Sequence, residues 1–208
     1  MVPKEVMLQW QNELYEKFNL NVPLYDGGEL IWRKTHGWEG PTQKAVSREE
    51  WHREPIVICS SQLMRRRDRE FELLGADDWD LLVLDEAHHA RRRGAGGVQQ
   101  GGPNALLRLM RELHKKCRDL LLLTATPMQV DPVEVFDLLQ LLGLPPEWAG
   151  DPDRFRRYFD LVSGNPSQED MEFLAEIFRS TEHEFGPWAT RPCPSFCRQS
   201  QGWDARES

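Results

Sequence analysis

Two uninterrupted aliphatic runs constrain the fold of this chain more than any other feature. The first, Leu81–Leu84, leads directly into Asp85 and Glu86, and the second, Leu120–Leu123, leads into Thr124. Continuous apolar runs of this length are typical of strands buried on both faces of a parallel sheet. Thr124 lies 39 positions after Asp85 (124 − 85), which leaves room for one crossover helix. Right-handed βαβ geometry then brings both strand ends to the same rim of the sheet.

The rest of the chain alternates between helical and strand patterns, which predicts an α/β fold with a mostly parallel sheet flanked by helices. Residues 29–54 show no clear period and are expected to form an irregular insertion. The expected strands are Val22–Tyr25 and Ile56–Cys59, and the expected helices are Pro3–Phe18, Gln62–Leu74, Asn104–Lys116 and a segment that starts at Asp131-Pro132.

The acids after the first run have the chemistry of a nucleotide site. Ligands of open α/β sheets bind just beyond the carboxyl ends of the strands. Asp85 can hold a Mg²⁺ bound to nucleotide phosphates there, and Glu86 can orient or deprotonate the attacking water. The hydroxyls of Thr124 and Thr126 can sense the γ-phosphate. The simpler alternative is a strand that ends in a charged, solvated turn.

These motifs carry a resemblance to a known family. Asp85-Glu86-Ala87-His88 resembles the second motif of the Swi/Snf-like branch of the superfamily-two helicases and translocases, and Leu123–Gln129 resembles the third. The segment Val2–Leu14 is similar to the part of the family that follows its first conserved strand, loop and helix. The resemblance extends from Val2 to Phe159.

The resemblance implies part of a first RecA-like lobe of the P-loop NTPase type, with ATP and Mg²⁺ as cofactors and double-stranded DNA as partner. It implies that Asp85 holds the metal, that Glu86 acts on the water and that His88 couples nucleotide state to the other motifs. The implied relay residues are Thr124, Thr126 and, as a weaker candidate, Gln129. The candidates for nucleic-acid contact are Ser60, Ser61, Arg91, Arg92 and Arg93.

Two departures from the family pattern limit what this chain can do. Val130 stands where the family has Asn, and no Lys is preceded by Gly, so no phosphate-binding Gly-Lys-Ser/Thr is present. We therefore expect a fragment of a nucleic-acid-dependent ATPase that is inactive alone and needs the missing remainder of the protein or a second RecA-like lobe. The alternatives are a non-hydrolysing binding or regulatory module with the same fold, and a small metal-dependent hydrolase that uses Asp85, Glu86 and His88.

Composition narrows the class of protein further. The net charge of −8 argues against a simple basic nucleic-acid-binding module. The four cysteines are scattered and no segment has the apolar length of a membrane span, so a cytoplasmic protein without a membrane partner is expected. We predict a partial lobe over residues 1–160, a helical extension over 161–180 and a disordered or non-native tail over 181–208.

Overall fold

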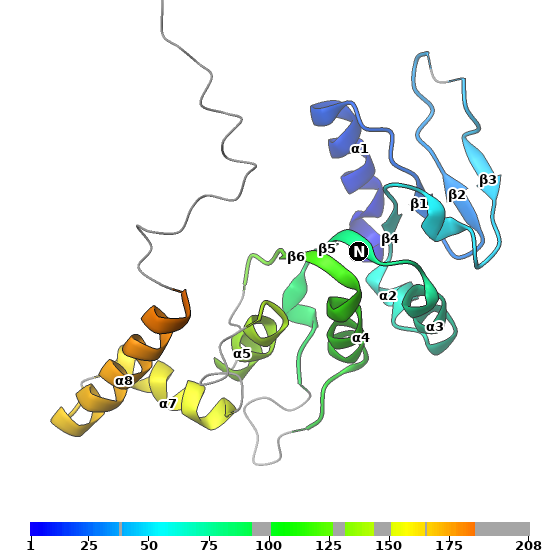
Figure 1. Cartoon of the computed structure of the whole chain (residues 1–208). Helices are drawn as coiled ribbons and strands as arrows, with labels where there is room; N and C mark the ends of the chain where they lie inside the picture. Colours follow the sequence, from blue (N-terminus) through cyan, green and yellow to red (C-terminus); the bar gives the residue numbers. More distant parts are fainter. Residues whose placement is uncertain (38, 93–100, 127–131, 144–150, 165, 186–208) are drawn as a thin grey trace, which may run out of the picture. The chain divides into compact units, whose positions relative to one another are not determined.

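The computed structural model describes residues 1–37, 39–92, 101–126, 132–143, 151–164 and 166–185, the side chains of 180–185 excepted. The chain forms two compact units, Met1–Leu144 and Pro145–Ser208 (Figure 1). The mixed α/β character confirms the expected fold class. The predicted boundaries between lobe, helical extension and tail, at residues 160 and 180, stay a prediction.

The first unit begins with an amphipathic helix, as the sequence predicts. A 3₁₀ turn over Lys4–Val6 leads into α1 (Met7–Phe18). Trp10 and Leu14 on one face of α1 pack against a small buried cluster that includes Leu24 and Ile58. Asn19 ends the helix in the left-handed conformation, and its N–H donates to the Tyr15 carbonyl at 2.9 Å.

The first sheet has the order β3-β2-β1-β4. β1 pairs in parallel with β4, and β2 pairs antiparallel with both β1 and β3. The strands are short: β1 (Leu24–Tyr25), β2 (Glu29–Ile31), β3 (Gln43–Ala45) and β4 (Ile58–Cys59).

The expectation of an irregular insertion over residues 29–54 is therefore wrong. This region contains a β-hairpin and a 3₁₀ turn over Trp51–Arg53. Trp51 is fully buried and stacks on Tyr25, with ring centroids 4.5 Å apart. Strands of three residues are too short to show an alternating pattern, so no period can be detected in this region.

The second sheet contains the two aliphatic runs. β5 (Trp79–Leu84) and β6 (Cys117–Leu122) pair in parallel, with Leu82 opposite Leu120, and α4 (Ala105–Leu113) connects them. Leu82 and Leu84 are buried in a core shared with α4, but Leu81 is 54% exposed. The expectation that this sheet is buried on both faces is thus wrong for the face that carries Leu81, which α4 does not cover.

The first two residues join the two sheets, and we call this pair the seam. Val2 N–H donates to the Cys59 carbonyl at 3.0 Å, and the Val2 carbonyl accepts from Ser61 N–H at 2.8 Å. On the other side, the Met1 ammonium donates to the Val83 carbonyl at 2.7 Å, and Asp85 N–H donates to the Met1 carbonyl at 3.0 Å. The seam occupies the position of a very short parallel strand between β4 and β5.

The segment expected to form one helix over Gln62–Leu74 forms two, α2 (Ser61–Met64) and α3 (Arg67–Gly75). Arg66 between them has an extended backbone, and Asp68 in the first turn of α3 favours a new helix start at this point. The remaining helix of the first unit is α5 (Pro132–Leu141), and short 3₁₀ turns cover Ala87–His89 and His114–Lys116.

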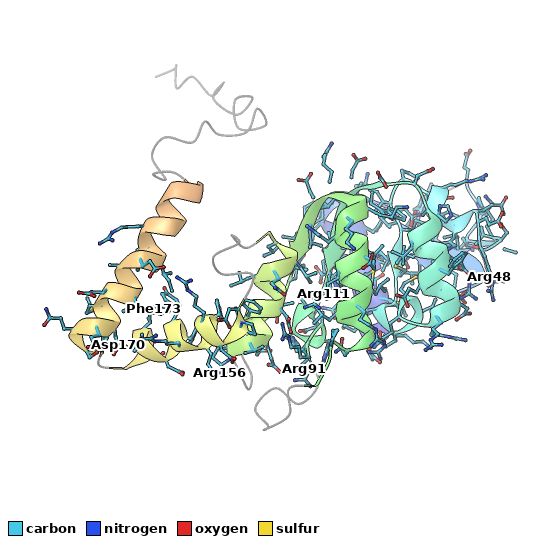
Figure 2. All side chains as sticks on the ribbon, turned by 60° about the horizontal axis from the view of Figure 1, so that its bottom comes forward. Arg48, Arg91, Arg111, Arg156, Asp170 and Phe173 are labelled. Carbon is cyan, nitrogen blue, oxygen red and sulfur yellow. The ribbon has the colours of Figure 1, made fainter. Side chains whose placement is uncertain are left out.

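The second unit consists of two described helices. α7 (Pro152–Ser163) is capped by Asp151, whose carboxylate accepts from the N–H groups of Asp153 and Arg154. Arg157 of α7 pairs at 3.2 Å with Asp170 of α8 (Gln168–Phe185). Asp170 is labelled in Figure 2. α8 continues to Phe185, five residues into the segment expected to be irregular, and the rest of that segment lies outside the described residues. No helix in the described ranges is both long and apolar enough to cross a membrane.

Candidate functional site

Asp85 lies at the carboxyl end of β5 and its side chain is fixed from two directions. Oδ2 accepts a hydrogen bond of 2.7 Å from the indole Nε1 of Trp10, and Oδ1 accepts one of 2.9 Å from the N–H of Glu86. The backbone N–H of Asp85 is held by the seam. Carboxylate oxygens have about four lone-pair sites between them, so Asp85 keeps acceptor capacity for a further ligand.

Glu86 turns the chain sharply out of the sheet. Its backbone is left-handed, with φ 51° and ψ 47°, and Asn19 is the only other non-glycine residue with positive φ in the described ranges. For a residue with a Cβ this conformation costs roughly 1–2 kcal/mol. The chain after it is held in place, because Ala87 is fully buried and its N–H donates to the Leu123 carbonyl at 2.8 Å.

His88 connects the two strand ends. Its Nδ1 lies 3.0 Å from the Thr124 hydroxyl oxygen and 3.1 Å from Oε2 of Glu86. A protonated Nδ1 donates to these oxygens, whereas an unprotonated Nδ1 accepts from the Thr124 hydroxyl, so the ring tautomer decides which link is made. The side chain of His88 is 12% exposed, which restricts its alternative partners.

The structure describes only Leu123–Thr126 of the third motif. Thr124 Oγ1 also accepts from the Thr126 N–H at 3.2 Å, which ties both threonines to the contact with His88. Gln129 lies outside the described residues.

Burial lowers the pKa of His89, next to His88, and the proximity of His88 lowers it further.

Ser60 and Ser61 are satisfied within the protein. Both hydroxyls donate to Oε1 of Gln62, at 3.0 and 3.2 Å, and Ser60 Oγ caps α2 by accepting from Leu63 N–H. Lys4 N–H donates to the same amide oxygen at 3.0 Å. Gln62 therefore organises this strand end, a role that the sequence pattern did not indicate. Contact between these serines and nucleic acid stays a prediction.

The basic residues after the acidic motif pair with α5. Arg91 lies 3.1 Å from Glu134, and Arg92 lies 3.0 Å from Asp137, which also pairs with Arg111 of α4 at 3.1 Å. Figure 2 labels Arg91 and Arg111. Asp137 is completely buried. Burial raises the pKa of its carboxyl group, an effect that the two guanidinium groups oppose.

This ion-pair cluster gives Arg91 and Arg92 a structural role that the sequence did not reveal. The available signal for these ion pairs was the position of two acids, Glu134 and Asp137, on the buried face of a helix. Buried acids are almost always paired. Arg91 is 41% exposed and can still meet a phosphate, whereas Arg92 is 21% exposed. Arg93 lies outside the described residues, and nucleic-acid contact by these arginines stays a prediction.

The hydrolase alternative requires Asp85, Glu86 and His88 to converge on one metal ion. Within the described ranges, no group of three or more His, Cys, Asp or Glu side chains is placed to hold a metal ion. Asp85, Glu86 and His88 are close in sequence, but the first directs its oxygens to Trp10 and the Glu86 N–H, while the other two contact each other.

A family model described as the SNF2-related domain matches residues 1–181. The chain belongs to this family. The resemblance to Swi/Snf-like superfamily-two proteins is thereby confirmed. Among curated proteins, the RNA polymerase-associated protein RapA of Yersinia enterocolitica serotype O:8 / biotype 1B is 31% identical over 166 residues. That match covers 78% of this SNF2-related chain but only 14% of RapA.

The helicase domain of Hef from Pyrococcus furiosus is a similar solved structure. The TM-score is 0.43 at 17% identity, with 90% of this SNF2-related chain and 43% of the other chain covered.

Proposed function

We propose that this chain is part of the first RecA-like lobe of a nucleic-acid-dependent ATPase, which in the complete protein couples ATP hydrolysis to movement on double-stranded DNA. The observation that carries the proposal is the contact of His88 with both Glu86 and Thr124, which connects the two strand ends at the predicted rim. Membership in the SNF2-related family supports the same class of function.

Asp85 is the residue proposed to meet Mg²⁺. Magnesium in nucleotide sites takes one or two carboxylates and completes its shell with phosphate oxygens and water. A single oriented carboxylate at a strand end fits that donor set. The bound metal would neutralise charge on the phosphates. Trp10 and the Glu86 N–H keep the carboxylate oriented before any nucleotide arrives.

Glu86 is proposed to orient the attacking water and accept its proton. Its side chain is 39% exposed, so the carboxylate reaches the solvent side of the rim. The contact of His88 with Glu86 and Thr124 offers a way to pass a change at the nucleotide to the second strand end. We propose Thr124, Thr126 and Gln129 as the continuation of that relay.

The proposed site is incomplete in this chain. It has no phosphate-loop lysine, and phosphoryl transfer depends mainly on positioning and charge neutralisation. The missing groups would come from the remainder of the same protein or a second RecA-like lobe. RapA is an RNA polymerase-associated protein, which favours a nucleic-acid setting for this chain as well.

The test uses nucleotide titration followed by variants in a longer protein that supplies the phosphate loop. The chain alone should show neither micromolar affinity for Mg·ATP nor turnover. In the longer protein, Glu86→Gln should keep ATP binding and abolish hydrolysis, whereas Asp85→Ala should weaken Mg·ATP binding itself. Glu49→Gln changes an exposed glutamate away from the site and serves as the matched control. Parental hydrolysis in both site variants would refute the proposed site.

The second candidate is a non-hydrolysing regulatory module, which the missing lysine favours. If the longer protein binds DNA in the same way with and without ATP and never hydrolyses it, this candidate replaces the first.

A further inference from the structure

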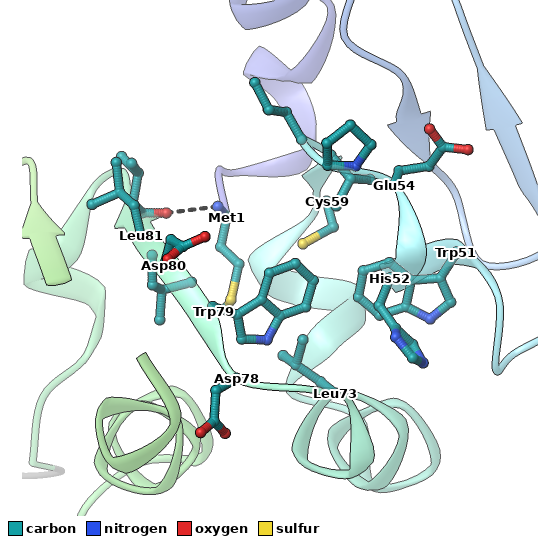
Figure 3. Close-up of a pocket in the computed structure, with 15 residues that line it drawn as sticks. Met1, Trp51, His52, Glu54, Cys59, Leu73, Asp78, Trp79, Asp80 and Leu81 are labelled. Carbon is teal, nitrogen blue, oxygen red and sulfur yellow. Dashed lines mark hydrogen bonds between the residues drawn. The ribbon is translucent and has the colours of Figure 1, made fainter. Parts of the chain in front are cut away.

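The carboxyl ends of β4 and β5 lie two strand positions apart, because the seam lies between them. On one side the seam is bonded to Cys59 and Ser61. On the other side the Met1 ammonium donates to the Val83 carbonyl (Figure 3, dashed line). Neighbouring strands are about 4.8 Å apart, so the two strand ends lie roughly 10 Å from each other. Side chains that follow these ends in sequence can therefore act on one ligand.

Arg65 follows the end of β4. It is the C-cap residue of α2, and its N–H donates to the Ser61 carbonyl at 3.3 Å. Its side chain is exposed, and no carboxylate in the described part of the chain forms an ion pair with it. The hydroxyls of Ser60 and Ser61 already donate to Gln62. Arg65 is therefore left to donate to a ligand outside the chain.

His89 and Arg91 follow the end of β5. Asn104 fixes the backbone of this segment, because its side chain donates to the His89 carbonyl at 2.7 Å and its N–H donates to the Arg91 carbonyl at 3.0 Å. The imidazole of His89 is exposed and packs on His88, with ring centroids 4.2 Å apart. Arg91 remains 41% exposed although it pairs with Glu134. Both side chains can thus reach a ligand at the surface.

The cationic groups of the two strand ends act on one another. Partial burial lowers the pKa of His89, and the neighbouring His88 lowers it further, an effect that Glu86 opposes. Arg91 and Arg65 also lower this pKa, which places both guanidinium groups near the imidazole, in agreement with the spacing of the strand ends. Like charges gathered in this way repel one another, and a bound polyanion removes the repulsion.

We infer that Arg65, His89 and Arg91 form one binding surface for the phosphate backbone of double-stranded DNA. The inference rests on the proposed function for the identity of the polymer. The strand ends that present these groups lie roughly 10 Å apart, a length over which one DNA strand carries about three phosphates. Contacts of this kind fix the position of the duplex and carry no sequence information. We call the three residues the phosphate surface.

The first test measures the pKa of His89 by NMR in the full chain, with the resonance assigned by its loss in His89→Gln. A short DNA duplex at low salt should raise this pKa by about half a unit or more, because bound phosphate favours the protonated imidazole. His36 and His114 are exposed, lie toward the amino ends of the parallel strands and should not shift. Inorganic phosphate at the same ionic strength should leave the pKa of His89 nearly unchanged.

The second test measures the affinity of variants of the full chain for the same duplex. Arg65→Gln should reduce the slope of log affinity against log salt by about one. Arg53 is exposed and precedes β4 at the opposite end of that strand, so Arg53→Gln is the matched control and should leave the slope unchanged.

The pH dependence of the affinity gives an independent readout. Because bound phosphate raises the pKa of His89, the affinity should rise as the pH falls through that pKa. His89→Lys keeps a positive charge and should bind tightly without this pH dependence. His89→Gln should stay at the affinity of the neutral imidazole across the same pH range.

Two kinds of outcome are distinguishable. Equal slopes for Arg65→Gln and Arg53→Gln, or an unchanged pH dependence in His89→Gln, would overturn the phosphate surface alone. An equal rise in the pKa of His89 with inorganic phosphate would overturn it too, since the site would then take a small anion. If the parent chain binds no duplex at low salt, the DNA part of the proposed function fails as well. None of these measurements uses ATP, so the roles proposed for Asp85 and Glu86 are tested separately.

Discussion

The indole N–H of Trp10 donates a hydrogen bond of 2.7 Å to the carboxylate of Asp85. The two residues are 75 positions apart and belong to α1 and to the end of β5. A hydrogen bond to a charged group is worth more than a neutral one, about 1.5–3 kcal/mol. Trp10 therefore fixes the orientation of the proposed metal-binding carboxylate and ties the first helix to the second sheet.

A double-mutant cycle measures this link in the chain itself. Trp10→Phe removes the donor and keeps most of the apolar ring, and Asp85→Asn removes the charge. Because both groups are partly exposed, we expect a coupling free energy near the low end of the range, about 1.5 kcal/mol, from urea unfolding. The control cycle pairs Trp10→Phe with Asp80→Asn, whose side chain is 89% exposed, and should give no coupling. Equal coupling in both cycles would contradict a specific bond.

The left-handed backbone at Glu86 predicts an unusual order of stabilities. Glu86→Gly should be more stable than Glu86→Ala by about 1 kcal/mol, because glycine adopts this conformation without strain. Both variants lose the same carboxylate, so their difference isolates the backbone. At Arg108 on the exposed side of α4 the order should reverse by about 1 kcal/mol. Thermal unfolding of the four variants checks this, and alanine above glycine at position 86 would count against it.

The ion-pair cluster around Asp137 should stabilise the first unit. Asp137→Ala leaves the guanidinium groups of Arg92 and Arg111 without their buried partner, and we expect a loss of about 3 kcal/mol in the free energy of unfolding. Asp137→Asn keeps one acceptor and should lose less. Asp119→Ala, at an exposed position on β6, is the matched control and should stay within about 0.5 kcal/mol of the parent. A similar loss for both alanine variants would argue against the cluster.

The sequence located the sheet correctly where a strong local pattern existed. The aliphatic runs identified β5 and β6 because four consecutive aliphatic residues are typical of a buried strand. The hairpin of β2 and β3 was missed because each strand has three residues, and because Leu30 of β2 is buried in a cluster with Tyr25 and Trp51, which lie outside the hairpin. Such a contact joins residues far apart in sequence and leaves no period to detect.

The same contrast holds for the candidate site. Asp85, Glu86, His88 and Thr124 belong to two recognisable sequence motifs, and the structure brings His88 into contact with both Glu86 and Thr124. Trp10, Gln62 and Asp137 were not identified, since each acts through long-range hydrogen bonds or ion pairs that spacing does not encode.

Salt dependence separates a nucleic-acid role for Arg91 from its structural role. In a longer protein that binds DNA, Arg91→Gln should reduce the slope of log affinity against log salt by about one if the side chain meets a phosphate. Arg118, at the opposite end of the sheet and 74% exposed, provides the matched control Arg118→Gln, which should leave the slope unchanged. Unchanged slopes for both variants would assign Arg91 to the ion pair with Glu134 alone.

The seam also bears on the order in which the first unit folds. β5 and β6 can pair after closing a loop of one crossover helix, but the bond between Met1 and Val83 spans 82 positions. Because closing a longer loop costs more chain entropy, contacts of high sequence separation form after local ones. The two sheets should therefore assemble separately and join last, at the seam. Until they join, the seam has no second strand to pair with, and its open edge can pair with other chains.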